Sequence, residues 1–402
     1  MNNAKKSLVP HRRFKEFQNA GAWEQRKLGD VVERFDNLRI PVTSSKRKRG
    51  ITPYYGANGI QDYVQGYTHD GEFVLVAEDG ANDLQNYPIH YVNGKVWVNN
   101  HAHVLQGKKD IADNLFLVNA IKRIKFETYL VGGSRAKLNA DVMMKLPIKM
   151  PKLNEQQKLG KYFSRIDTLI ALHQRKLNKL KKLKSAYLTE MFPDEGEHKP
   201  KRRFAGFTDD WEQRKFMDLI DSIIDFRGRT PKKLGMNWSN EGLLALSAQN
   251  VKDGYIDKTI DAHYGSQTLY DKWMNGRELH KGQVVFTTEA PMGNVARIPD
   301  ENKYILSQRT IAFTVKNTVL TEGFLMYLLE SPSVKNNLLR ISSGGTAKGV
   351  SQKTLSSLTV KIPTSLKEQE RINFVFYSLD SLITLHQREL KCIVNTFILT
   401  NT

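Results

Sequence analysis

In two stretches of the chain, most residues at every third or fourth position are apolar, and this pattern continues over many helical turns. The repeated positions are Leu159, Phe163, Ile166, Ile170, His173, Leu177, Leu180, Lys184, Tyr187 and Met191 in the first stretch, and Ile372, Phe376, Leu379, Ile383, His386, Leu390, Ile393 and Phe397 in the second. A mean spacing of about 3.5 residues is typical of helices that pack as a coiled coil. One histidine occupies the equivalent position of each seam, where we expect it to set the register rather than to catalyse or to bind a metal.

The two seams have the same internal phase, which predicts that the two helices pack against each other. A pseudo-two-fold axis between the halves requires that pair to be antiparallel. The alternative is two ordinary amphipathic helices, each packed on its own domain with a satisfied core histidine. Residues 158–184 carry nine Lys or Arg and one acid, whereas residues 367–391 carry four bases and four acids. The basic face is either solvated or a docking surface for an acidic partner.

The helices belong to an internal repeat that spans the chain. The letters WEQRK begin at Trp23 and again at Trp211, RRF precedes them each time, and LHQRKL returns as LHQREL. The segments between these repeats are short β-branched and aromatic runs broken by Gly and Asn, which favours α+β domains. We therefore divide the chain into an N-terminal segment of repeat 1 (1–27), a first α+β domain (28–150), a first coiled-coil helix (151–192), a linker with the start of repeat 2 (193–215), a second α+β domain (216–363) and a second coiled-coil helix (364–402). Because the frame repeats while its inserts differ, one task performed on two targets is expected.

The charge balance points to the kind of partner. Among 402 residues, 61 Lys and Arg face 42 Asp and Glu, a net charge of +19. Such an excess favours a polyanion, with nucleic acid first, although simple solubility is the alternative. The single cysteine, Cys392, excludes a disulfide framework and a cysteine-based zinc site. No signal peptide and no apolar run of membrane-spanning length is present, so a soluble cytoplasmic protein is expected.

The sequence contains no recognisable catalytic motif. It has neither a phosphate-binding P-loop nor the Asn/Asp-Pro-Pro-aromatic motif of amino-methyltransferases. The acidic residues of PDEGEHK at Pro193 are too closely spaced for a metal nuclease and lie in the linker. His101 and His103 could ligate a metal, but histidines in a strand without acidic neighbours are more often structural. We therefore expect no enzyme activity, no cofactor and no metal site.

The order of these motifs resembles the specificity subunit of Type I restriction-modification enzymes. RRFAGFTDDWEQRK, then VKIP, KEQERI and LDSLITLHQR, carry the resemblance, which covers nearly the whole chain. RIPVTSSKRKRGITPYYGANGI at Arg39 and DFRGRTPKK at Asp225 are similar to the openings of that family's target-recognition domains. The C-terminal NTFILTNT departs from the pattern because it lacks the basic, leucine-rich end of the first helix.

The resemblance implies a non-catalytic subunit whose two target-recognition domains each read one half of a split, asymmetric sequence of double-stranded DNA. The antiparallel conserved helices are then a spacer between the domains. The implied partners are two adenine-methylating modification subunits and two ATP-dependent translocase–endonuclease subunits. Trp23 and Trp211 are expected to close equivalent joints between each domain and the helical frame, or else to be plain core residues. The rival functions are a coiled-coil scaffold or linker protein without DNA specificity, and a nuclease with an unrecognised site.

Candidate DNA contacts fall into two chemical groups. Clustered Lys and Arg neutralise phosphates and supply affinity without reading sequence, whereas Arg, Asn and Gln read base edges. The phosphate candidates are Arg39, Lys46, Arg47, Lys48, Arg49, Arg227, Arg229, Lys232 and Lys233, together with Arg135, Lys137 and Lys348 in two Gly-Gly loops that could instead be hinges. The base-reading candidates are Asn58, Gln61, Gln249, Asn250 and Arg309.

Overall fold

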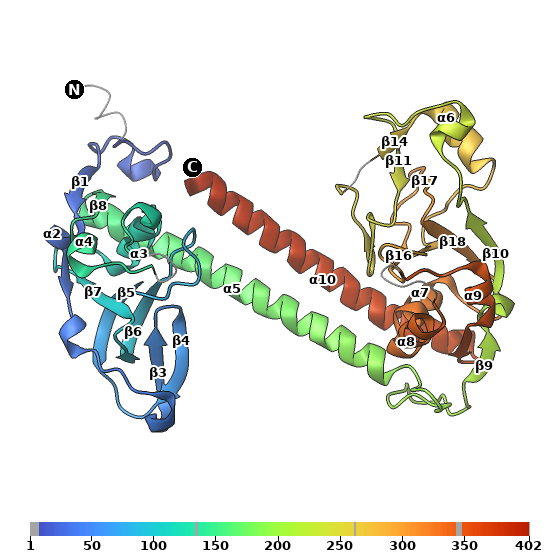
Figure 1. The fold of residues 1–402 in the computed structure, drawn as a ribbon, viewed down its shortest axis with the longest axis horizontal. Helices are drawn as coiled ribbons and strands as arrows, with labels where there is room; N and C mark the ends of the chain where they lie inside the picture. The colour runs from blue at the N-terminus through green and yellow to red at the C-terminus, as the bar shows by residue number, and fades with distance from the viewer. Residues whose placement is uncertain (1–7, 133–135, 261–262, 343–347, 402) are drawn as a thin grey trace. The chain divides into compact units, whose positions relative to one another are not determined.

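The computed structural model describes residues 8–132, 136–260, 263–342 and 348–401. The chain forms two compact units, residues 1–172 with 391–402 and residues 173–390. Two long helices, α5 (Leu153–Glu190) and α10 (Leu366–Asn401), contribute to both units and are green and red in Figure 1. Sheets and helices mix in each unit, which confirms the predicted α+β class.

The first unit is built on one six-stranded sheet. Its order is β2 (Val32–Arg34), β7 (Ala102–Gly107), β5 (His69–Ala77), β6 (Ile89–Val98), β3 (Arg49–Gly56) and β4 (Gly59–Val64). All neighbours are antiparallel except β3 and β6. Val74 and Val76 lie in the core that α3 (Asn114–Lys122) covers, whereas Leu75 lies in a separate cluster on the other face, as strand alternation requires. The short elements are η1 (Lys15–Phe17), α2 (Leu28–Val31), η2 (Asp36–Leu38), η3 (Ser44–Lys46), η4 (Phe126–Thr128) and α4 (Ala140–Met144).

The second unit has a different sheet architecture. A four-stranded antiparallel sheet has the order β10 (Ile220–Asp225), β18 (Thr310–Val315), β15 (Val284–Thr287) and β16 (Val295–Arg297). A three-stranded sheet has the order β14 (His263–Gly265), β11 (Leu243–Leu246) and β17 (Ile305–Leu306), and β12 (Val251–Lys252) pairs with β13 (Tyr255–Ile256). The helices are η5 (Phe216–Leu219), η6 (Pro231–Leu234), α6 (Gln267–Met274), α7 (Glu322–Glu330), α8 (Pro332–Ile341) and α9 (Gln352–Ser357). One core joins the four-stranded sheet to α7 and α10, and a second packs α6 against the three-stranded sheet.

Within the second unit, α5 and α10 pack as the sequence predicts. The seam positions of α5 from His173 to Tyr187 are buried or half-buried, as are those of α10 from Ile372 to Leu390. His173 meets Glu389 and, further along α5, Lys184 meets Asp380 at 2.8 Å, so the helices run antiparallel. The predicted antiparallel pair is therefore confirmed. In the part of the chain that the structure describes, no helix combines the length and apolar character needed to cross a membrane.

Candidate nucleic-acid interface

The repeated pentapeptide forms the same strand pair at the base of each domain. β1 (Glu24–Lys27) pairs antiparallel with β8 (Pro147–Met150), and β9 (Glu212–Lys215) pairs with β19 (Thr359–Ile362) in the same register. The strand that enters each domain thus pairs with the strand that leaves it. Both exit strands then lead directly into the long helices. The repeat in the sequence is therefore a structural base for two different inserts.

A buried ion pair anchors each base to the start of its long helix. Arg13 donates from Nε and Nη2 to the Glu155 carboxylate at 2.7 and 2.6 Å, and Arg203 donates equivalently to Glu368 at 2.8 and 2.8 Å. The indole N–H of Trp23 and that of Trp211 lie 3.4 Å from the same carboxylates. The hydrogen bonds to Glu155 and Glu368 raise the pKa of the Arg13 and Arg203 guanidinium groups. The predicted equivalent joints at the two tryptophans are confirmed, and Trp211 is also fully buried in the core.

The residue after each of these glutamates is a glutamine, and its side chain binds backbone groups of the neighbouring domain. The Gln156 side chain accepts from Asp113 N and donates to the carbonyls of Ile111 and Pro151. Gln369 makes the matching bonds to residues 319, 321 and 363. Asp113 and Thr321 are the N-caps of α3 and α7, so each glutamine fixes where the domain's own helix begins. These roles were not predicted from the sequence, although the Glu-Gln pair occurs in both repeats.

In the first domain, the basic loop leads into the edge hairpin of the sheet. Lys46, Lys48 and Arg49 are exposed, and Arg49 is the first residue of β3. Arg47 turns back instead, because its Nε donates to Val42 O at 3.1 Å and its guanidinium lies 4.1 Å from the centroid of the Tyr54 ring. Three of the four predicted cations are therefore available to a phosphate backbone.

Two predicted base-reading residues lie on the same hairpin. Gln61 is exposed on the edge strand β4. Asn58 is exposed in the turn, and its amide bridges to the next loop by donating to Gly80 O and accepting from Asn82 N, both at 2.9 Å. The structure thus brings the basic loop and both candidates onto one hairpin, with Asn58 already engaged in holding a loop.

Arg39 and Lys137 converge on one carboxylate inside the first domain. They lie 2.7 and 3.0 Å from the Glu78 oxygens. Burial raises the pKa of Glu78, but hydrogen bonds from both cations outweigh it and leave that pKa below its usual value. The two cations are therefore neutralised within the protein. Arg135, the third candidate of this region, lies outside the described residues.

The expectation that His101 and His103 lack acidic neighbours is wrong in three dimensions. His101 pairs with Asp79, and His103 Nδ1 lies 2.7 Å from Asp36. The acids come from segments distant in sequence, which a local pattern cannot reveal. His101 precedes β7 and His103 lies within it, and each histidine contacts a different acid, so the two histidines do not form one site.

In the second domain, three predicted cations converge from separate segments. Arg227 is held by Asp225 and lies 3.3 Å from Val350 O, two residues from Lys348. Arg309 Nε lies 3.5 Å from Glu289, whose backbone bridges to residue 349. All three residues are exposed, although the side chain of Arg227 is only 34% exposed. The segments that carry these three cations therefore lie close together in the second domain.

The other predicted residues of the second domain divide by exposure. Lys232, Lys233 and Gln249 are exposed, and Lys233 Nζ donates to Gly228 O at 2.7 Å. Arg229 is half-buried, donates to Trp273 O and stacks over Phe226. Asn250 is fully buried and its amide closes its own loop. A buried, fully bonded amide cannot reach a base edge in this conformation.

Comparison with known proteins identifies the family to which this repeated architecture belongs. The family model of the Type I restriction modification DNA specificity domain matches residues 21–182 and again residues 208–394. The chain belongs to this family. A putative type I restriction enzyme specificity subunit of Haemophilus influenzae is 29% identical over 360 residues, which cover 89% of this chain and 88% of the relative. A specificity subunit of Methanocaldococcus jannaschii is 22% identical over 391 residues, covering 91% and 88%.

The fold of this specificity subunit also matches a solved structure. The crystal structure of a Type I restriction-modification S subunit from M. genitalium has a TM-score of 0.71 at 12% identity and covers 98% of both chains. The resemblance inferred from the repeated motifs is confirmed by the two family matches. The specificity subunit recognises DNA and is not the catalytic member of its system.

Proposed function

We propose that this specificity subunit reads a bipartite, asymmetric DNA target, one half with each domain, and directs adenine methylation and ATP-dependent restriction by partner subunits. The observation that carries the proposal is that the two domains share the same strand pair and joint at their base but differ in the fold inserted between them. Both domains close on the same strand pair and the same Arg-Trp-Glu joint. One insert is a single six-stranded sheet, whereas the other combines sheets of four and three strands. Different surfaces on one frame suit two different half-sites.

The proposed recognition domains remain residues 28–150 and 216–363, as divided from the sequence. In the first, Lys46, Lys48 and Arg49 would contact phosphates, and Gln61 is the freest base reader. In the second, the phosphate contacts would come from exposed Arg and Lys, with Gln249 as a base reader. These second-domain cations are Arg227, Lys232, Lys233 and Lys348, and Arg309 remains a base-reading candidate beside Gln249. Arg39, Arg47, Arg229 and Asn250 would shape these surfaces from within, because each is buried or half-buried and held by protein groups. Lys137 is exposed but is paired with Glu78.

The proposed partners are two modification subunits and two restriction–translocation subunits per chain. The helices offer surfaces for such docking. Phe374 and Tyr377 of α10 are 70% and 58% exposed, although apolar side chains of this size are usually buried. On α5, the predicted basic face is exposed apart from Lys184, which the second unit uses internally. An aromatic strip and a basic face on a rigid pair suit a large protein partner.

The proposal is tested by exchanging one insert. Residues 28–145 are replaced by the corresponding segment of another specificity subunit, and the methylated motif is sequenced after co-expression with the modification subunit. One half of the motif should change while the other stays the same, because the second domain and both joints are untouched. The reciprocal exchange of residues 216–358 is the matched control and should change the other half. A motif that changes in both halves after either exchange would contradict independent reading.

A further inference from the structure

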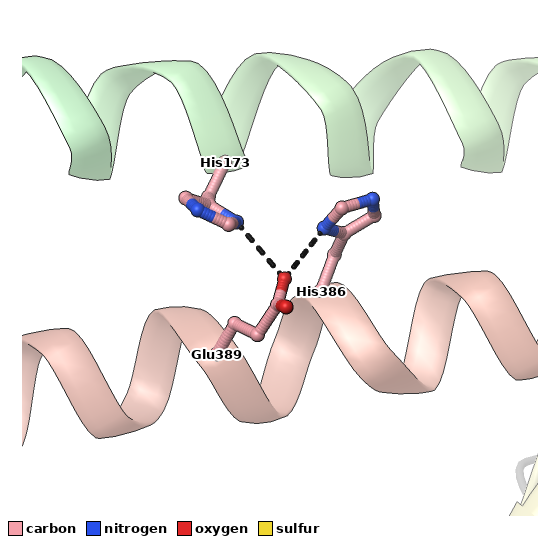
Figure 2. A group of neighbouring side chains, drawn as sticks. All are labelled: His173, His386 and Glu389. Atoms are coloured by element: carbon pink, nitrogen blue, oxygen red, sulfur yellow. Dashed lines mark hydrogen bonds and ion pairs between the residues drawn. The ribbon is translucent and has the colours of Figure 1, made fainter.

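Three side chains meet where α5 and α10 cross in the second unit. His173 projects from α5, whereas His386 and Glu389 project from α10, three residues apart (Figure 2). The Nδ1 atoms of His173 and His386 lie 3.2 and 2.9 Å from the same Glu389 oxygen. The imidazole rings are 5.5 Å apart at 63°. All three donor atoms lie within 4.8 Å of one another.

The hydrogen bonding of this cluster is incomplete as it stands. His386 Nδ1 is hydrogen-bonded to Glu389, but the Nδ1 atom of His173 is buried and has no hydrogen-bond partner, despite its short distance to the same carboxylate. A buried polar atom without a partner is costly. The imidazoles are 18% and 16% exposed and the carboxylate is 40% exposed, so solvent reaches the cluster from the glutamate side.

The donor set and spacing fit a transition-metal ion. Two imidazole nitrogens and one carboxylate oxygen are the ligands of many three-residue zinc sites, which keep one further position for water. Metal–ligand bonds of about 2.0–2.2 Å in tetrahedral geometry place neighbouring donors about 3.3–3.6 Å apart. The observed N–O separations of 2.9 and 3.2 Å therefore need to widen by about half an ångström or less at the middle of that range. His386 and Glu389 also have the i, i+3 spacing that places two ligands on one helical face.

A second cluster of acids and histidine shows why donor count alone is insufficient. Asp36, Glu78 and His103 also lie within reach of one another in the first unit. There, however, Arg39 and Lys137 lie 2.7 and 3.0 Å from Glu78, and these cations already neutralise the carboxylates. No cation pairs with Glu389 in the part of the chain that the structure describes. Its charge is therefore available to an ion.

The internal repeat makes the site asymmetric. The first copy of the motif reads LHQRKL and the second LHQREL, so the repeat-equivalent of Glu389 is Lys176. A symmetric pair of such motifs would supply either two carboxylates or two lysines. This chain instead combines both histidines with a single acid and places the lysine on an exposed position of α5.

We propose that His173, His386 and Glu389 bind a divalent transition-metal ion of the zinc class, which clamps α5 to α10. The ion provides a partner for the Nδ1 atom of His173. It also replaces the approach of both imidazoles to one Glu389 oxygen by three metal–ligand bonds. It therefore stabilises the antiparallel pair and its register. In this proposal the histidines set the register through a bound metal, whereas the sequence predicted that they do so without one.

The test uses the full chain after removal of metal with a chelator. Co²⁺ is titrated while visible absorption is recorded, because tetrahedral cobalt absorbs strongly, and Zn²⁺ is then added to displace it. One ion should bind, and Zn²⁺ should raise the melting temperature. His173→Gln and Glu389→Gln should each weaken binding at least about 100-fold, since loss of a ligand costs no less than loss of a supporting residue. Glu370→Gln, which changes an exposed carboxylate of α10, should bind like the wild type.

A gain-of-ligand variant separates metal binding from damage to the fold. Lys176→Glu restores the carboxylate that the repeat predicts and should tighten Co²⁺ binding at least about tenfold, approaching a four-ligand site. Circular dichroism of each metal-free variant checks that the helices are intact. The proposal is overturned if the wild type and His173→Gln bind Co²⁺ alike.

Discussion

The joint at Glu368 offers the sharpest test of the repeated frame. Its carboxylate is 1% exposed and receives two bonds of 2.8 Å from Arg203, whose side chain is 13% exposed. Glu368→Gln keeps the shape and one acceptor oxygen but leaves the buried guanidinium without its counter-charge. Breaking one side of a buried pair costs about 3–5 kcal/mol, and the retained oxygen reduces the expected loss to about 2–3 kcal/mol.

Hydrogen exchange with mass-spectrometric detection locates this loss along the chain. The amides that pair β9 with β19 lie beside the joint, so their exchange should accelerate by about 30- to 140-fold, at tenfold per 1.4 kcal/mol. The pair β1–β8 should be unaffected. Glu155→Gln is the matched control, because the same change in the first joint should accelerate β1–β8 and spare β9–β19. Equal acceleration of both pairs by either variant, or of neither, would refute the idea of two independent joints.

Two further predictions concern charge. Lys184→Met should lower the free energy of unfolding of the second unit in urea by about 3–5 kcal/mol, because it leaves the carboxylates of Glu330 and Asp380 without their cation. The control Lys182→Met changes an exposed lysine and should alter that free energy by less than about 0.5 kcal/mol. Replacing Lys46, Lys48 and Arg49 by Ala should reduce the slope of log K for duplex DNA against log salt by up to about 2.7, at about 0.9 per phosphate contact. The same three-charge loss at exposed Lys15, Lys27 and Lys145 should leave the slope unchanged, and equal slopes for all three proteins would argue against the basic loop as a contact.

The long helices were predictable because burial along a helix follows a period that the sequence displays directly. Even Lys184, a cation at a seam position, obeys that pattern. Its partners, Glu330 and Asp380, could not be found from the sequence, because one of them comes from a different helix of the second domain. Burial and the nearby acid Asp380 raise the pKa of Glu330, while the two carboxylates raise the pKa of Lys184 despite its burial. The pattern thus gave the position of the residue but not its chemistry.

The recognition surfaces were only partly predictable, and the reason is local packing. Four adjacent cations look alike in the sequence, yet Arg47 packs on Tyr54 while its neighbours remain exposed. Gln249 and Asn250 are also adjacent, and only the first is exposed. Sheet topology was out of reach as well, because the parallel pairing of β3 with β6 joins segments about 40 residues apart without a local signal. Exposure depends on contacts that the surrounding fold supplies.

The way the frame holds its inserts explains how recognition can vary while assembly does not. The side chains that form the first joint, Arg13, Trp23, Glu155 and Gln156, all lie outside residues 28–150. The Gln156 side chain is hydrogen-bonded to one backbone N–H and one backbone carbonyl of the first insert, and Gln369 makes the same two kinds of bond to the second insert. Every residue except proline offers both groups, whatever its side chain. An insert therefore needs to present only a helix start of the right geometry, and its remaining surface is free to be shaped by the DNA sequence it reads.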